Sequence, residues 1–200
     1  MKRLVVACLI MLMSAGFAWS ASTQDALKMA EQTSSQMLEA LNQNRAQLQQ
    51  EPHRIYGLVE NILLPHFDFE TMARWVLGKY WRQADPAQQQ QFTQEFRTLL
   101  VQTYAKALLE YSNEVIRFLP LQAAQADDVS IRSEVQPKSG PAIPINYSMH
   151  VRGGEWKVYD VVIDGVSLIT NYRNSLGGQV RTEGIAGVIQ KLRERNSQGS

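Results

Sequence analysis

The nine residues WKVYDVVID, from Trp156 to Asp164, constrain the fold most, because they predict a β-strand that is apolar on both faces. Strict alternation along a strand puts two apolar sets on opposite faces: Tyr159, Val161 and Ile163 on one, and Trp156, Val158 and Val162 on the other. A strand that meets water on one face should instead alternate apolar and polar residues. This strand must therefore be covered twice, and the second cover can be more helices, a partner protein or a bound apolar ligand.

Three segments upstream of this strand also predict strands, at 114–119, 129–135 and 143–151, and turn residues such as Pro137 and Gly140 separate them. Gly153-Gly154 predicts a tight hairpin between the third of these segments and the Trp156 strand. The sequence thus predicts a four-stranded, mainly antiparallel sheet.

Helices are predicted before and after the strands in the sequence. Capping residues mark the helix starts at Ser22 or Thr23, at Asp68, and at Asp85 followed by proline and glutamine. A strong amphipathic repeat covers 55–63. After Asp164 we expect two helical pieces that separate near Gly177-Gly178. Helices, then strands, then helices indicate an α+β domain.

The N-terminus is typical of an export signal. Lys2 and Arg3 precede an apolar run that is too short to span a membrane, and Ala18 and Ser20 satisfy the small-x-small cleavage rule. We expect residues 1–20 to be removed, with a cut after Ala18 as the alternative, and residues 21–200 to form a single exported domain, which suits a bacterial periplasm.

Composition excludes several function classes. The single cysteine, Cys8, lies in the expected signal, so the mature chain has no disulfide, thiol nucleophile or cysteine metal site. The chain has 20 basic and 19 acidic residues, and two of the basic ones lie in the signal. A nearly neutral mature chain gives no indication of nucleic acid or of a strongly anionic membrane as a partner.

Candidate catalytic groups are few. His53, His66 and His150 show no metal-binding spacing, so neither a metal nor a cofactor is expected. Asp160 and Asp164 could form a carboxylate pair, although capping and turn roles explain them more simply. An enzyme is therefore not expected.

Two separated motifs carry a family resemblance. LLPHFDFETMARWVLGKYWRQADPAQQQQF, followed by WKVYDVVIDGVSLITNYRNS and RTEGIAGVIQKL, is similar to the MlaC family of periplasmic phospholipid-binding proteins, also called toluene-tolerance or auxiliary ABC-transport proteins. The resemblance covers nearly the whole mature chain. It implies a curved antiparallel sheet of the nuclear-transport-factor type, which helices wrap around a hydrophobic cavity for acyl tails.

The resemblance also implies a carrier. Phospholipid would pass between an outer-membrane lipoprotein–porin complex and an inner-membrane ABC transporter with its substrate-binding membrane subunit, which maintains the lipid asymmetry of the outer membrane. The acyl tails would be buried and the headgroup exposed. Two alternatives stay open: a periplasmic chaperone for lipoprotein acyl chains, and an enzyme with Asp160 deep in the same kind of cavity.

Side-chain spacing suggests which residues face the cavity. We expect the tails between the sheet and the central helices, against a wall of aromatic and branched residues: Trp75, Val76, Tyr80, Leu100, Tyr104, Leu108, Tyr147, Val158, Val161, Val166, Ile169 and Tyr172. Exposed basic residues near the helical mouth, Arg74, Lys79 and Arg82, are the candidates for docking to partners.

Overall fold

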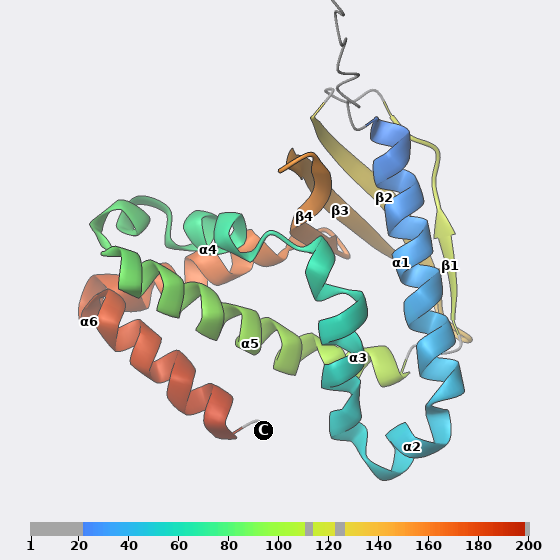
Figure 1. Cartoon of the computed structure of the whole chain (residues 1–200), viewed down its shortest axis with the longest axis horizontal. Coiled ribbons are helices and arrows are strands. Elements are labelled where there is room, and N and C mark those ends of the chain that lie inside the picture. The colour runs from blue at the N-terminus through green and yellow to red at the C-terminus, as the bar shows by residue number, and fades with distance from the viewer. Residues whose placement is uncertain (1–21, 111–113, 123–126, 199–200) are drawn as a thin grey trace, which may run out of the picture.

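The computed structural model describes residues 22–110, 114–122 and 127–198. It shows an α+β fold with one antiparallel sheet in the order β1-β2-β3-β4-β5, preceded and followed by helices. Figure 1 shows the twisted sheet and α1 at one end of the molecule and the layered helices α4, α5 and α6 towards the other. The predicted fold class is confirmed. The expected signal, residues 1–20, lies outside the described residues.

The N-terminal helices follow the capping signals. Helix α1 spans Thr23–Gln43, and the Ser22 and Asp25 side chains form a reciprocal capping box at its start. Helix α2 spans Arg45–Gln50, the 3-10 turn η1 spans Pro52–Arg54, and α3 spans Ile55–Ile62. The helical path is interrupted before and after α3 at Pro52 and Pro65, because proline lacks the amide hydrogen that a continuing helix needs.

The central helices also begin where they are predicted. After η2 (Leu64–His66), α4 spans Phe69–Leu77, and its N-cap Asp68 accepts a hydrogen bond from the Thr71 amide. The turn η3 (Gly78–Gln83) leads to α5, Pro86–Glu110. Asp85 and Gln88 cap α5 by exchanging two hydrogen bonds of 2.8 and 3.1 Å.

The sheet has one strand more than predicted. Its strands are β1 (Val115–Phe118), β2 (Asp128–Gln136), β3 (Ile143–Arg152), β4 (Glu155–Ile163) and the two-residue β5 (Val166–Ser167). Gly153 and Gly154 form the predicted β3–β4 turn with positive φ angles of 61° and 84°. Asp164 and Gly165 make a second positive-φ turn, which folds β5 back onto β4.

A β-bulge in β4 overturns the predicted assignment of its faces. Ser148 of β3 lies opposite Asp160, but Met149 lies opposite Val158, so Tyr159 is an extra residue. A bulge shifts the alternation by one position. Val158 and Val161 therefore lie on the same face, packed in one cluster with Trp156, Val129 and Ile131. We call this the inner face.

Tyr159 lies on the opposite, outer face, where its ring contacts Trp75 and His150 at centroid distances of 4.9 and 5.0 Å. The two apolar faces inferred from strict alternation are thus mostly one face. The outer face of the β3–β4 pair carries polar residues such as Arg152 and Lys157.

Helix α6, Leu168–Gln198, contains a break that the sequence placed wrongly. The break lies at Gly184 (φ 74°, ψ 172°), whereas the predicted point, Gly177-Gly178, is continuous helix. Beyond Gly184 the helix packs back along α5, where the Asn196 amide donates to the Glu95 carbonyl at 2.9 Å.

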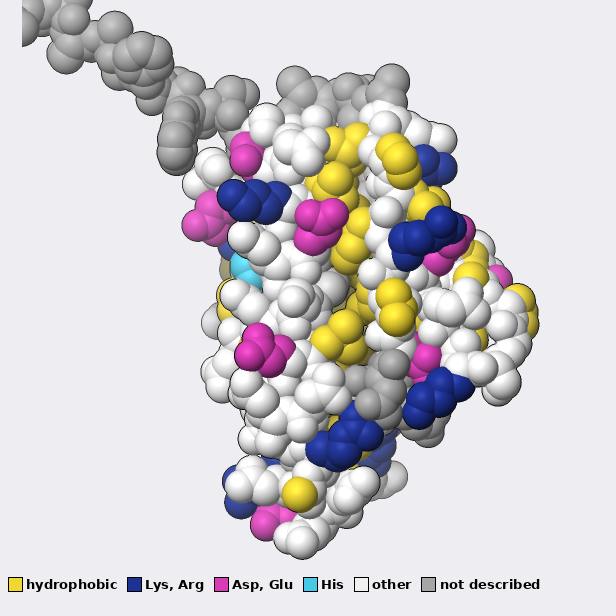
Figure 2. All heavy atoms as spheres, turned by 90° about the vertical axis from the view of Figure 1, so that its right-hand side faces the viewer, with side chains coloured by type: hydrophobic (Ala, Val, Ile, Leu, Met, Phe, Trp, Pro, Cys, Tyr) yellow, Lys and Arg dark blue, Asp and Glu magenta, His cyan; other side chains and the backbone are white. Residues whose placement is uncertain are grey.

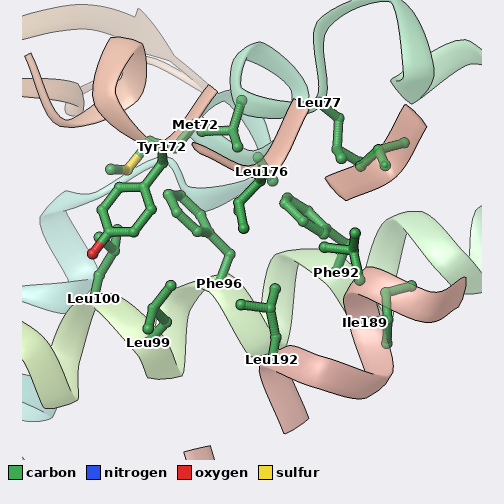
Figure 3. Close-up of a cluster of buried hydrophobic side chains, with 14 of the residues drawn as sticks. Met72, Leu77, Phe92, Phe96, Leu99, Leu100, Tyr172, Leu176, Ile189 and Leu192 are labelled. Carbon is green, nitrogen blue, oxygen red and sulfur yellow. The ribbon is translucent and has the colours of Figure 1, made fainter. Parts of the chain in front are cut away.

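The buried apolar residues of the described ranges form three clusters. The first joins α4, α5 and both arms of α6, and Figure 3 shows its side chains converging, among them Phe92, Phe96, Leu176 and Leu192. The second joins the inner face to α1, and the third joins α1, α2, α3 and α5. Tyr104 of α5 packs against both the first and second clusters, so it links the helical layer to the sheet.

Candidate functional site

Helix α1 covers the inner face of the sheet with small side chains. Ala26 and Ala30 are its buried residues there, packed in the cluster that contains Val129, Ile131 and Met149. A buried leucine contributes about 1.5–3 kcal/mol, and alanine much less. The N-terminal half of α1 is therefore held against the sheet by little apolar area.

An apolar seam runs beside this contact. Half-buried residues border the same cluster from both sides, Leu27 and Met29 from α1, and Phe118 and Leu121 from β1 and the segment that follows it. We call these four residues the seam. Figure 2 shows apolar side chains in a strip on the face that carries α1 and β1. The strip leaves apolar side chains partly exposed between helix and sheet.

The two ends of α1 are anchored differently. At the start, the Trp156 indole N–H donates to the Ser22 carbonyl at 2.8 Å. At the far end, Met37 and Leu41 are buried in the third cluster with Ile55 and Val59. Among the described residues, the start of α1 is thus held by this hydrogen bond and by small side chains, whereas its end is held by larger ones.

Two tyrosines near the inner face, Tyr104 and Tyr147, have raised pKa values. Burial raises the pKa of Tyr147, although a hydrogen bond with Ser133 opposes the shift. Burial and the neighbouring Tyr172 raise the pKa of Tyr104 to about 12. Both phenols are therefore uncharged at neutral pH, and they suit an apolar ligand better than an ionic one.

A buried carboxylate fixes α4 to the outer face. Asp68 accepts hydrogen bonds from the Thr71 amide and hydroxyl, from His150 Nε2 at 2.9 Å and from Arg152 Nη1 at 2.8 Å. Burial alone would raise the pKa of Asp68, but these hydrogen bonds outweigh it and lower the pKa. Sequence reasoning found only the capping role of Asp68. The spacing of His150 and Arg152, two apart on one strand face, was the signal for the rest.

Asp160 has a structural task. It is buried, and it accepts hydrogen bonds from the Ser167 hydroxyl at 2.6 Å and from the Ile169 amide at 3.1 Å. Both carboxylate oxygens are thereby engaged at the start of α6. Asp164 lies on an exposed turn with φ 49°, so the two carboxylates do not share a site.

The predicted wall residues are divided among the clusters. The first cluster contains or borders Val76, Tyr80, Leu100, Ile169 and Tyr172, and the second contains or borders Tyr147, Val158 and Val161. Tyr104 packs against both of these clusters, and Leu108 borders the third. Trp75 and Val166 are exposed. The structure does not bring the twelve together around one space.

Two surface grooves lie elsewhere. One of about 410 Å³ lies between α2 and α3, beside Leu48 and Leu58. The other, of about 460 Å³, lies between η3 and α6, beside Tyr80, Arg181 and Gly184. Among the described helices, none combines the length and the apolar character that crossing a bilayer requires.

Known proteins resemble this chain along most of its length. A toluene tolerance protein, ttg2D, of Pseudomonas putida is 31% identical over 153 residues, which cover 76% of this chain and 71% of that protein. The intermembrane phospholipid transport system binding protein MlaC of Haemophilus influenzae is 30% identical over 172 residues, covering 84% and 80%.

A solved structure has the same fold. The phospholipid-binding protein of Ralstonia solanacearum, in complex with a phospholipid, superposes with a TM-score of 0.80 at 30% identity and covers 87% of this chain and 98% of its own. The model of the MlaC protein family matches residues 31–194, which include α3 to α5, the whole sheet and most of α6. The chain therefore belongs to the MlaC family.

Proposed function

We propose that this chain is a periplasmic phospholipid carrier. The single observation that carries the proposal is the likeness, at a TM-score of 0.80, to a protein whose structure holds a phospholipid. The weakly held α1 and its apolar seam support the same role. No catalytic step is part of the proposal, because Asp160, the one residue considered for catalysis in a cavity, is engaged in capping α6.

The physical task of such a carrier is to shield acyl tails from water. Exposing a tail costs about 0.8 kcal/mol for each methylene, so a carrier needs a long apolar sleeve and an uncharged interior. The inner face offers branched side chains, and its neighbouring phenols stay neutral. An exposed headgroup needs no charged pocket.

We place the tails between α1 and the inner face, entering along the seam. Of the predicted wall residues, Tyr147, Val158, Val161 and Tyr104 border this space and remain our candidates. The tails would replace the sparse contacts of Ala26 and Ala30 and move the start of α1 outward. Trp75 and Val166 are exposed, and this placement does not use them.

The wider pathway is also part of the proposal. Export by residues 1–20 would place the mature chain, starting at Ala21, one residue before the N-cap of α1. The partners would be an outer-membrane lipoprotein–porin complex and an inner-membrane ABC transporter. An intact mass that begins at Ala21 would support the boundary, and retention of Met1 in exported protein would contradict it.

Placing a charge in the seam tests the site. Met29→Glu puts a carboxylate among the half-buried apolar residues of α1, and we expect lipid loading to fall at least tenfold, since a buried charge is strongly unfavourable beside acyl chains. Gln32→Glu makes the same change of charge on the exposed side of α1 and should leave loading unchanged. The measurement is uptake of a fluorescent phospholipid from vesicles, and equal uptake by both variants would contradict the placement.

A further inference from the structure

Five basic side chains gather on the surface formed by α4, η3 and the first arm of α6. They are exposed, and they come from three elements: Arg74, Lys79, Arg82, Arg173 and Arg181. We call them the basic platform. Figure 1 places α4 and α6 at the end of the molecule away from α1 and β1.

Local contacts link the three elements that carry the cations, and Arg82 lies on η3 next to Gln83, which lines the groove between η3 and α6. The Arg173 guanidinium lies against Gly78, because a Cβ added to Gly78 would lie only 2.9 Å from Arg173 Nη2. Gly78 begins η3, one helical turn after Arg74 of α4. The Lys79 ammonium lies 5.1 Å from the centroid of the Tyr80 ring. Tyr80 and Arg181 line the same groove between η3 and α6.

The basic platform has no acidic counterpart of its own. Within the described part of the chain, none of its five cations forms an ion pair with a carboxylate. The acids on the same elements are paired elsewhere, Glu70 with Arg152 and Glu183 with Lys191. Asp85, which follows η3, caps α5. On the face with the seam, by contrast, acidic and basic side chains are interspersed (Figure 2).

Trp75 lies beside Arg74 on the exposed side of α4, with 42% of its surface exposed. Tryptophan and tyrosine rings favour the headgroup level of a bilayer, and cations next to them favour anionic lipid. A specific protein interface needs an apolar core within about 800 Å² on each partner. One exposed tryptophan among five cations does not supply that core.

We propose that the basic platform docks this protein onto bilayers rich in anionic phospholipid. A nearly neutral chain can do so because its positive charge is concentrated on one surface. Docking is electrostatic, weak and reversible, and it leaves the seam at the other end free to exchange lipid. The docking surface does not depend on the tail site, so the two proposals can fail separately.

Vesicle flotation tests the docking. The full mature protein should float with phosphatidylcholine–phosphatidylglycerol vesicles and not with phosphatidylcholine alone. Raising the salt from about 0.1 M to about 1 M shortens the Debye length from about 10 Å to about 3 Å and should release the protein. Protein with and without bound lipid should float equally well.

A charge-matched pair of variants locates the surface. Each cation near an anionic surface contributes about fivefold to binding, so the triple variant Arg74→Gln, Lys79→Gln, Arg82→Gln should bind about 100-fold more weakly. Its control neutralises three exposed cations outside the platform, Lys106→Gln, Lys138→Gln and Arg195→Gln, and should bind like the parent apart from a small loss. Equal binding by the two variants would overturn the proposal.

The remaining outcomes are also decisive. Absence of flotation by the parent protein would overturn the proposal. It would point to an acidic protein surface as the binding partner of the basic platform. The lipid content of the platform variant should equal that of the parent. Absence of bound lipid from the parent protein as well as from both variants would refute the carrier role and leave the flotation result standing.

Discussion

Asp68 joins three segments of the chain through one buried carboxylate. Its backbone amide donates to the Val158 carbonyl at 2.9 Å, while its side chain caps α4 and accepts hydrogen bonds from His150 and Arg152 of β3. Asp68 thus helps to fix the helical layer to the outer face of the sheet, together with the Trp75–Tyr159 ring contact.

Removing this carboxylate should destabilise the fold. We expect Asp68→Ala to lower the free energy of unfolding by about 2–3 kcal/mol, because α4 loses its cap and donors on Thr71 and His150 lose their acceptor. Glu70→Ala removes the other partner of Arg152, but this pair is exposed and should contribute less than about 0.5 kcal/mol. Urea unfolding of both variants measures the difference, and equal losses would contradict the central role of Asp68.

The same carboxylate predicts a pH dependence. The pKa of Asp68 is lower in the folded protein than its ordinary value of 3.8. Its contribution to stability is therefore present above that value and is lost as the pH falls towards the folded pKa. The stability difference between the parent protein and Asp68→Asn should shrink as the pH is lowered from about 5 to about 3. A difference that stays constant over this range in urea unfolding would rule out a stabilising role for the charge of Asp68.

Gly184 determines the course of α6. Its φ of 74° is a conformation that non-glycine residues adopt only with strain, whereas Gly177 is helical and has open space around its missing Cβ. Gly184→Ala should therefore destabilise the protein by about 1–3 kcal/mol. Gly177→Ala should stabilise it by about 0.4–1 kcal/mol, because the unfolded chain becomes less flexible. Thermal unfolding of both variants is the test, and the reverse order would contradict the geometry.

The elements differ in how far local sequence determines them. The starts of α1, α4 and α5 were predicted because a cap such as Ser22 or Asp85 satisfies amides within its own turn. The bulge at Tyr159 was not predicted, because an extra residue is defined only against the partner strand β3. The α6 break was misplaced because Gly177, Gly178 and Gly184 are alike in sequence, and only packing against α5 selects one of them.

The candidate site was predictable only in part. Tyr147, Val158 and Val161 were correctly grouped with the sheet, since they lie on or next to the strongest strand signal. Leu108 and Ile169 were assigned to the same wall because helical spacing marks an apolar face without saying which cluster it enters. Leu27 and Met29, which we propose as part of the seam, were not among the predicted wall residues, because their helical spacing indicates an ordinary buried face.

At the scale of the whole molecule, three structural features are separated in space. The seam lies at the end formed by α1 and β1, and the basic platform lies on α4, η3 and α6 (Figure 1). The hydrogen bonds of Asp68 join the sheet to α4. Under the two proposals, the protein would be held at one end while it exchanges lipid at the other.

The central claim is that this chain holds phospholipid by its acyl tails. Native mass spectrometry of the protein purified from the periplasm, followed by extraction and identification of the lipid, tests it most directly. We predict a mass increment of one phospholipid, lost on delipidation and restored by incubation with vesicles. Protein that carries no lipid as purified, and takes none from vesicles, would contradict the account.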